Sequence, residues 1–196
     1  MIEIPAPRGR FWVSVIPAAA TLALAAPFRQ PRESSRDHMQ AGPRPAVIGA
    51  QDGERRFLRG GVAPLLIKVD PVTTGSQRMV LGSSDLPPGD AIRLHRHLRE
   101  DEIILISRGT AQVQLGSQQY TAGPGTTVFI PQGTCIAVTN AGKDTLSNVF
   151  IFSSPGFEQV LREVSSPEGA APKHVSATER AAAFHRGHAD ASPRDC

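Results

Sequence analysis

Two histidines and one glutamate in this sequence lie at a spacing that suits metal binding. They are His95, His97 and Glu102, within the stretch from Gly89 to Gly109. In an extended strand successive side chains alternate between the two faces, so His95 and His97 point the same way. A short turn through residues 98–101 could fold the apolar run after Glu102 back against this strand. Three nitrogen and oxygen donors would then surround one point, as a bound divalent metal requires.

The length and charge of the chain favour a single domain with tails. A chain of 196 residues is long enough to bury a core without disulfide bonds. Lys and Arg number 21 against 18 Asp and Glu, which gives a formal charge of +3 with the two signs interspersed. The sequence has no basic stripe broken by aromatic residues, so it gives no support for nucleic-acid binding.

The N-terminus has the pattern of a secretory signal peptide over residues 1–25. Arg8 and Arg10 precede an uncharged run over residues 11–27 that ends in small residues, which suits cleavage before Ala26. This pattern predicts a periplasmic or secreted protein. A misassigned start codon or a disordered N-terminal arm is the alternative, and the protein would then be cytoplasmic. No permanent membrane anchor is expected, because an uncharged run interrupted by Pro17 is short for a hydrocarbon layer of about 30 Å.

The sequence contains two cysteines, Cys135 and Cys196. In an oxidising compartment they could form a disulfide bond. Cys135 lies inside an apolar run, where a small buried hydrophobic residue is the alternative role.

Nine short runs between turn signals predict an all-β domain. They cover residues 65–69, 78–81, 92–97, 103–107, 111–115, 118–121, 127–130, 135–139 and 146–152. Regularly spaced turns without a long amphipathic helix are typical of an antiparallel sandwich or barrel. We expect this barrel over residues 47–155, after a flexible linker over residues 26–46 that is rich in Pro, Arg and Ser.

The periodicity changes after the last predicted strand. Apolar residues at helical spacing follow Pro155, which predicts a short helix from Phe157 to Val164. Ser176 and Glu179 form a capping box at the start of a second helical run that Gly187 can end. We therefore expect a helical extension over residues 156–187 and a disordered tail over residues 188–196.

The glycines and metal-binding residues form a longer pattern. The first part of the pattern is Gly89-x5-His95-x-His97-x4-Glu102-x6-Gly109, and the second is Gly125-x5-Pro131-x-Gly133 with Asn140 beyond it. This pattern resembles the two signatures of the cupin superfamily, in particular single-domain, quercetin dioxygenase-like members. The resemblance implies an antiparallel double-stranded β-helix, or jelly-roll barrel, with one or two short C-terminal helices.

The sequence departs from the family pattern at one position. Cupins carry a fourth ligand, a histidine, where this chain has Ile136. The resemblance therefore implies a divalent metal, which could be iron, nickel, manganese or zinc, held by His95, His97 and Glu102 with open coordination positions. The residues that we expect to line the pocket are Arg93, Ile104, Val113 and Ile136. An aliphatic side chain at position 136 would make the pocket drier and favour an apolar or aromatic ligand.

Three interpretations of the site remain open at this point. The first is a metal held by three ligands. In the second, loss of the fourth ligand leaves a metal-free pocket. In the third, the histidines are ordinary strand residues and Glu102 forms a surface ion pair with a neighbouring arginine.

The resemblance implies two classes of function for a small-molecule partner. One is a metal-dependent dioxygenase or isomerase that acts on an enediol, flavonol or diketone-like compound, with Glu102 as the catalytic base. The other is a non-catalytic binding or sensing module. Small cupins resemble one another in forming homodimers, and we expect the same of this chain.

Overall fold

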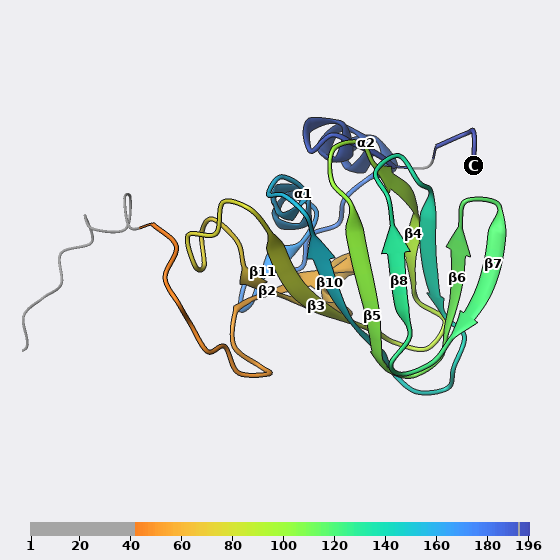
Figure 1. The fold of residues 1–196 in the computed structure, drawn as a ribbon, viewed down its shortest axis with the longest axis horizontal. Helices are drawn as coiled ribbons and strands as arrows, with labels where there is room; N and C mark the ends of the chain where they lie inside the picture. Colours follow the sequence, from red (N-terminus) through yellow and green to blue (C-terminus); the bar gives the residue numbers. More distant parts are fainter. Residues whose placement is uncertain (1–41, 192) are drawn as a thin grey trace, which may run out of the picture. The chain divides into compact units, whose positions relative to one another are not determined.

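The computed structural model describes residues 42–191 and 193–196, which form two antiparallel sheets and two α-helices (Figure 1). The seven-stranded sheet contains, in spatial order, β11 (Ser166–Pro167), β1 (Glu54–Leu58), β2 (Ala63–Val69), β3 (Val80–Leu86), β10 (Leu146–Phe152), β5 (Glu102–Arg108) and β8 (Thr127–Ile130). The five-stranded sheet contains β12 (Ala189–Ala191), β4 (Ala91–His97), β9 (Ile136–Asn140), β6 (Ala111–Leu115) and β7 (Gln118–Ala122). The predicted jelly-roll fold is confirmed. The predicted signal peptide and most of the predicted linker lie outside the described residues.

The main hydrophobic core fills the space between the two sheets. Strand β5 shows how the sequence builds this core, because Ile104 and Ile106 are buried whereas Leu105 is exposed. The members of the core cluster are Leu86, Ile104, Ile106, Ala111, Val113, Ala122, Val128, Ile130, Ile136, Val138 and Leu146. Burial of each large aliphatic side chain contributes about 1.5–3 kcal/mol relative to exposure.

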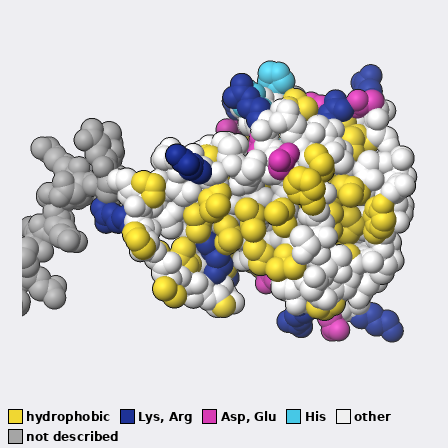
Figure 2. Space-filling model, in the orientation of Figure 1, with side chains coloured by type: hydrophobic (Ala, Val, Ile, Leu, Met, Phe, Trp, Pro, Cys, Tyr) yellow, Lys and Arg dark blue, Asp and Glu magenta, His cyan; other side chains and the backbone are white. Residues whose placement is uncertain are grey.

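The outer face of the seven-stranded sheet is also apolar. Ile103 on β5 lies opposite Phe129 on β8 and Ile151 on β10, and Ile151 lies opposite Leu81 on β3. Phe129 is 57% exposed. Figure 2 shows hydrophobic side chains gathered across this face. These residues therefore form an apolar row that the described residues leave uncovered.

Two helices cover one end of the barrel and build a second hydrophobic cluster. They are α1 (Phe157–Glu163) and α2 (Ala177–Arg186), and both lie at the same end in Figure 1. Helix α2 begins with the predicted capping box, in which the Ser176 side chain accepts a hydrogen bond from the Glu179 N–H. Their buried faces bring Phe157 and Phe184 against Phe152 of β10. No helix in the described part of the chain is long and apolar enough to cross a membrane.

Three differences from the expected elements concern strands β1, β3 and β12. Strand β1 was not predicted, because its sequence of mainly polar residues lacks an apolar alternation. Strand β3 continues to Leu86 through the Gly-Ser-Ser-Asp segment, whose composition predicts a turn. Gly82 lies opposite Phe150 within this strand, and a side chain at position 82 would clash with the Phe150 ring. Residues 189–191, expected in a disordered tail, form β12, which is paired with β4.

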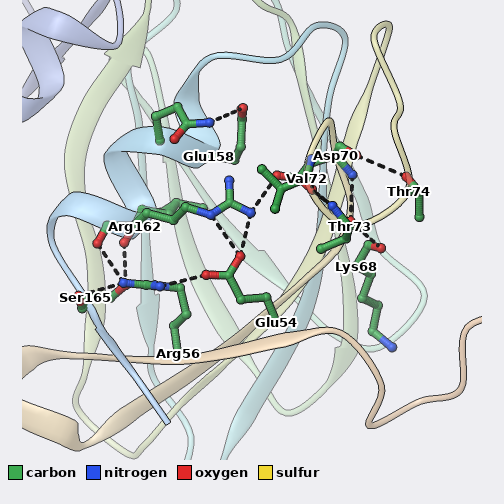
Figure 3. Close-up of polar contacts among 12 residues, drawn as sticks. Glu54, Arg56, Lys68, Asp70, Val72, Thr73, Thr74, Glu158, Arg162 and Ser165 are labelled. Carbon is green, nitrogen blue, oxygen red and sulfur yellow. Dashed lines mark hydrogen bonds and ion pairs between the residues drawn. The ribbon is translucent and has the colours of Figure 1, made fainter. Parts of the chain in front are cut away.

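A cluster of buried and partly buried ions, the Arg162 cluster, links helix α1 to strands β1 and β2. It consists of Glu54, Arg56, Asp70 and Arg162 (Figure 3). Arg162 Nη2 lies 2.5 Å from Glu54 Oε2 and 2.7 Å from Asp70 Oδ2. Arg56 Nη1 donates to the other Glu54 oxygen at 2.7 Å, and its Nη2 donates to the Arg162 carbonyl oxygen at 2.8 Å. Because each carboxylate faces a guanidinium, the charges of the cluster balance.

Candidate metal centre

Strands β4 and β5 bring the three predicted donors together. His95 and His97 lie on one face of β4, and Glu102 is the first residue of β5. Their residue exposures are 5%, 2% and 5%. The Gly133 N–H donates to the His97 carbonyl oxygen at 2.6 Å, so the loop of the second motif fixes the end of β4. The sequence predicted that the strand after Glu102 would fold back against the histidine strand, but β4 and β5 do not pair. The turn over residues 98–101 instead carries the chain from the five-stranded sheet to the seven-stranded sheet, so Glu102 faces the histidines from the opposite sheet.

The donor atoms converge on one point. His95 Nε2 lies 3.2 Å from His97 Nε2, which in turn lies 3.2 Å from Glu102 Oε2. One donor atom from each of the three residues lies within 4.8 Å of the others. Glu102 Oε2 is buried and has no hydrogen-bond partner in the described part of the structure. Imidazole nitrogen and carboxylate oxygen are ligands for zinc, iron, nickel and manganese, so these residues fit a divalent metal.

A hydrogen bond at His95 and a nearby carboxylate at His97 orient the two imidazoles from outside the donor set. His95 Nδ1 lies 2.8 Å from the Arg93 carbonyl oxygen, which leaves Nε2 directed at the other donors. His97 Nδ1 lies 3.6 Å from Glu100 Oε1. A carboxylate behind a metal-binding imidazole fixes its orientation and raises its basicity. Glu100 is 2% exposed and was not predicted, although its spacing of three residues from His97 was a signal.

The environment moves the pKa values of the two histidines in opposite directions. Burial, together with the neighbouring His97, lowers the pKa of His95 to about 4. Burial also disfavours the charged form of His97, but Glu100 and Glu102 outweigh it and raise the pKa of His97 to about 9. A metal ligand must be a neutral imidazole, so metal binding at neutral pH would release a proton from His97.

The position of the absent fourth ligand is aliphatic. Ile136 on β9 lies directly opposite His95 on β4 and is fully buried. Paired residues in an antiparallel sheet share a face, so Ile136 offers a methyl surface where an imidazole would offer a donor. Ile104 and Val113 pack with Ile136 in the main core, and none of these three is among the residues that line the cavity described next. Arg93, the fourth residue expected in the pocket, does line it.

A cavity of about 380 Å³ opens beside His95 and Glu102. This volume is in the range of small-molecule sites. Phe157 and Phe184, from helices α1 and α2, contact the imidazoles, with a centroid distance of 4.3 Å between Phe157 and His97. Their aromatic rings close one wall of the cavity. The sequence placed both phenylalanines in helical segments but gave no sign that they reach the metal centre.

A disulfide bond between Cys135 and Cys196 joins the barrel to the C-terminus, with 6.1 Å between the Cα atoms. Cys135 directly precedes Ile136 on the loop before β9. Along the sequence β12 lies between helix α2 and Cys196. The disulfide bond therefore fastens the end of the chain to the barrel. Cys135 therefore forms a disulfide bond and is not a free buried thiol.

Comparisons with known proteins support this fold. Residues 82–152 match the family model described as Cupin domain. A predicted oxalate decarboxylase from Thermotoga maritima is similar in structure, with a TM-score of 0.50 and 20% identity over 56% of this chain and 100% of that chain. KdgF from Halomonas sp. has a TM-score of 0.49 and 17% identity over 56% of this chain and 95% of that chain. No curated protein matches this sequence.

The likeness to the Thermotoga maritima structure concerns the fold alone, because the identity is only 20%. The family match is more specific, since residues 82–152 include His95, His97 and Glu102 as well as the glycines of both motifs. Residues 82–152 of this chain are therefore a cupin domain.

Proposed function

We propose that this protein is an exported, metal-dependent cupin that binds a small molecule through oxygen atoms at the centre formed by His95, His97 and Glu102. The observation that carries the proposal is the buried donor set, whose Glu102 Oε2 lacks a hydrogen-bond partner in the described residues. An unsatisfied buried carboxylate oxygen costs free energy, and a bound cation would remove that cost. The cavity beside it provides space for the small molecule.

The chemistry that fits this site is reaction at an enediol, flavonol or β-diketone. A bound divalent metal would supply Lewis-acid stabilisation of the anion of such a compound. The phenylalanines of α1 and α2 exclude water from the histidines, which strengthens electrostatic interactions inside the site. Glu102 lines the cavity, and its carboxylate could hold or remove a proton of the bound molecule if it left the metal. Dioxygenation and isomerisation both begin with such an anion.

A non-catalytic binding or sensing module is the second candidate function. The observation that favours it is Ile136, because three protein ligands hold a metal less tightly than four. Nearby, Ile104 and Val113 add further aliphatic surface and no acid or base. A wild-type protein that binds the small molecule but does not convert it would support this second function.

Two features support export and a homodimer. The disulfide between Cys135 and Cys196 suits an oxidising compartment, in agreement with the signal-peptide pattern of the N-terminus. The apolar row on the outer sheet face, centred on Ile103 and Phe129, suits burial against a second copy. Detection of the mature N-terminus by mass spectrometry and of the mass in solution by light scattering would test these two features.

The function is tested with the metal and the compound varied separately. We would load the protein in turn with Fe(II), Ni(II), Mn(II) and Zn(II), add acetylacetone or quercetin, and measure dioxygen consumption and the product by mass spectrometry. We expect turnover that depends on the metal and is lost in Glu102→Gln. The exposed Glu168→Gln is the matched control and should behave as the wild type. Binding of these compounds to metal-free protein with undiminished affinity would contradict the proposal.

A further inference from the structure

Three arginines surround the cavity at the metal centre. Arg59, Arg93 and Arg180 all line it, and they come from the segment after β1, from β4 and from α2. The same three arginines line an adjoining cavity of about 310 Å³, where Lys173 and His174 join them. Glu102 is the only acidic residue along the first cavity, and the described residues place none along the second.

Two of the three guanidinium groups have no counter-ion in the part of the chain that the structure describes. Arg59 forms an ion pair with Asp90 and donates to the Ala91 carbonyl oxygen. Among the described residues, neither Arg93 nor Arg180 forms an ion pair. Burial, with the charges of Arg93 and Arg59 added, lowers the pKa of Arg180. The three cations therefore repel one another in a setting that a bound anion would stabilise.

The backbone at Arg59 is strained where this cluster forms. Its φ is 51°, in the left-handed region that residues other than glycine seldom adopt. The bonds to Asp90 and Ala91 fix its guanidinium beside the cavity. Such strain persists only where surrounding contacts hold it, and it concentrates at functional sites.

We propose that the small molecule bound at the metal centre carries an oxyanion, a carboxylate or a phosphate, that Arg59, Arg93 and Arg180 bind. This inference rests on the proposed function and adds the class of substrate to it. The ligand would have an apolar body against Phe157 and Phe184 and a charged group at the arginines. Guanidinium groups suit this role because their N–H groups match the oxygens of carboxylate and phosphate in pairs.

The test compares anionic probes with a neutral one of similar shape. We would titrate Zn(II)-loaded and metal-free protein with 4-phenylbutyrate, phenyl phosphate and 4-phenylbutyramide by calorimetry. We expect at least one anion to bind roughly tenfold more tightly than the amide. Preference for the carboxylate or for the phosphate identifies the group that the site takes. Equal affinity for both anions and the amide would overturn the proposal without any variant being made.

Variants locate the preference at the arginines. In Arg93→Gln/Arg180→Gln the preference for the anion should disappear, whereas Zn(II) content should be unchanged. Arg78→Gln/Arg99→Gln removes the same charge from two exposed positions that line neither cavity, and should keep the preference. A preference that survives in Arg93→Gln/Arg180→Gln would refute the subsite. A wild type that prefers the anion but takes up no metal would instead refute the proposed function and retain the subsite.

Discussion

Two buried polar clusters in this molecule differ in the balance of their charges. In the Arg162 cluster two guanidinium groups face two carboxylates, those of Glu54 and Asp70. At the metal centre two carboxylates, those of Glu100 and Glu102, share the single imidazolium of His97. No lysine or arginine forms an ion pair with either of these carboxylates in the described part of the chain. The two clusters therefore differ in the balance of their charges and not in hydrogen bonding, because each holds buried side-chain atoms without a hydrogen-bond partner in the described part of the chain.

The difference separates a structural role from a binding role. Arginine stays protonated in proteins, so the Arg162 cluster is neutral without any ligand. Histidine changes its charge near neutral pH, and two neutral imidazoles can accept a metal ion. Buried charge that remains unbalanced after folding therefore marks the site where a ligand is expected.

The largest expected effect is a loss of stability when the charge-balanced Arg162 cluster is broken. Arg162→Met leaves Glu54 and Asp70 without their shared cation, and loss of one partner of a buried ion pair costs about 3–5 kcal/mol. Urea unfolding would measure this change. Metal content per folded molecule should stay at the wild-type value.

The control for this variant is a change at Arg186, the last residue of helix α2. Arg186 pairs with Glu163 at an exposed position, so Arg186→Met should leave the free energy of unfolding nearly unchanged. Equal destabilisation by both variants would show that burial of the Arg162 cluster does not matter.

A smaller effect is expected when the imidazole of His97 loses its orienting carboxylate. Glu100→Gln keeps the shape but removes the charge 3.6 Å from His97 Nδ1. Loss of such a partner lowers metal affinity by about 10–100-fold. Competition for Zn(II) with a chromophoric chelator would measure it, with the exposed Asp101→Asn as the neighbouring control. An unchanged affinity would mean that Glu100 does not support the centre.

The smallest effect concerns acid stability. Burial alone would raise the pKa values of Glu54 and Asp70, but contacts with Arg162, and with Arg56 or Thr73, lower them below the ordinary 4.5 and 3.8. Their stabilisation is complete above about pH 4.5 and is lost as the pH falls further, because the unfolded state then binds more protons. The free energy of unfolding of the wild type should therefore fall more steeply below this pH than that of Arg162→Met. Parallel pH profiles would contradict this expectation.

Much of the fold and the three donors could be predicted because they depend on local pattern. Alternation along β4 puts His95 and His97 on one face whatever the rest of the chain does, and turn residues fix the strand ends. The capping box of α2 is likewise local. Strand β1 was missed because its mainly polar sequence lacks an apolar alternation. The edge strands β11 and β12 were missed because their pairing partners are distant in the sequence.

The remaining parts of the site depend on contacts between distant segments. Glu100 reaches His97 only through the path of the turn between β4 and β5. Phe157 and Phe184 reach the histidines only after helices α1 and α2 pack on the barrel. Arg59 joins Arg93 at the cavity through a left-handed backbone that its sequence does not signal.

The most direct test of the metal centre is its stoichiometry. Protein stripped with a chelator, reloaded with Zn(II) and freed of excess metal would be analysed by inductively coupled plasma mass spectrometry, with folding checked by circular dichroism. We predict one ion per wild-type chain and none in a folded His95→Ala/Glu102→Ala variant. A folded wild type without metal, or a variant that retains one ion per chain, would contradict the assignment of the centre to His95, His97 and Glu102.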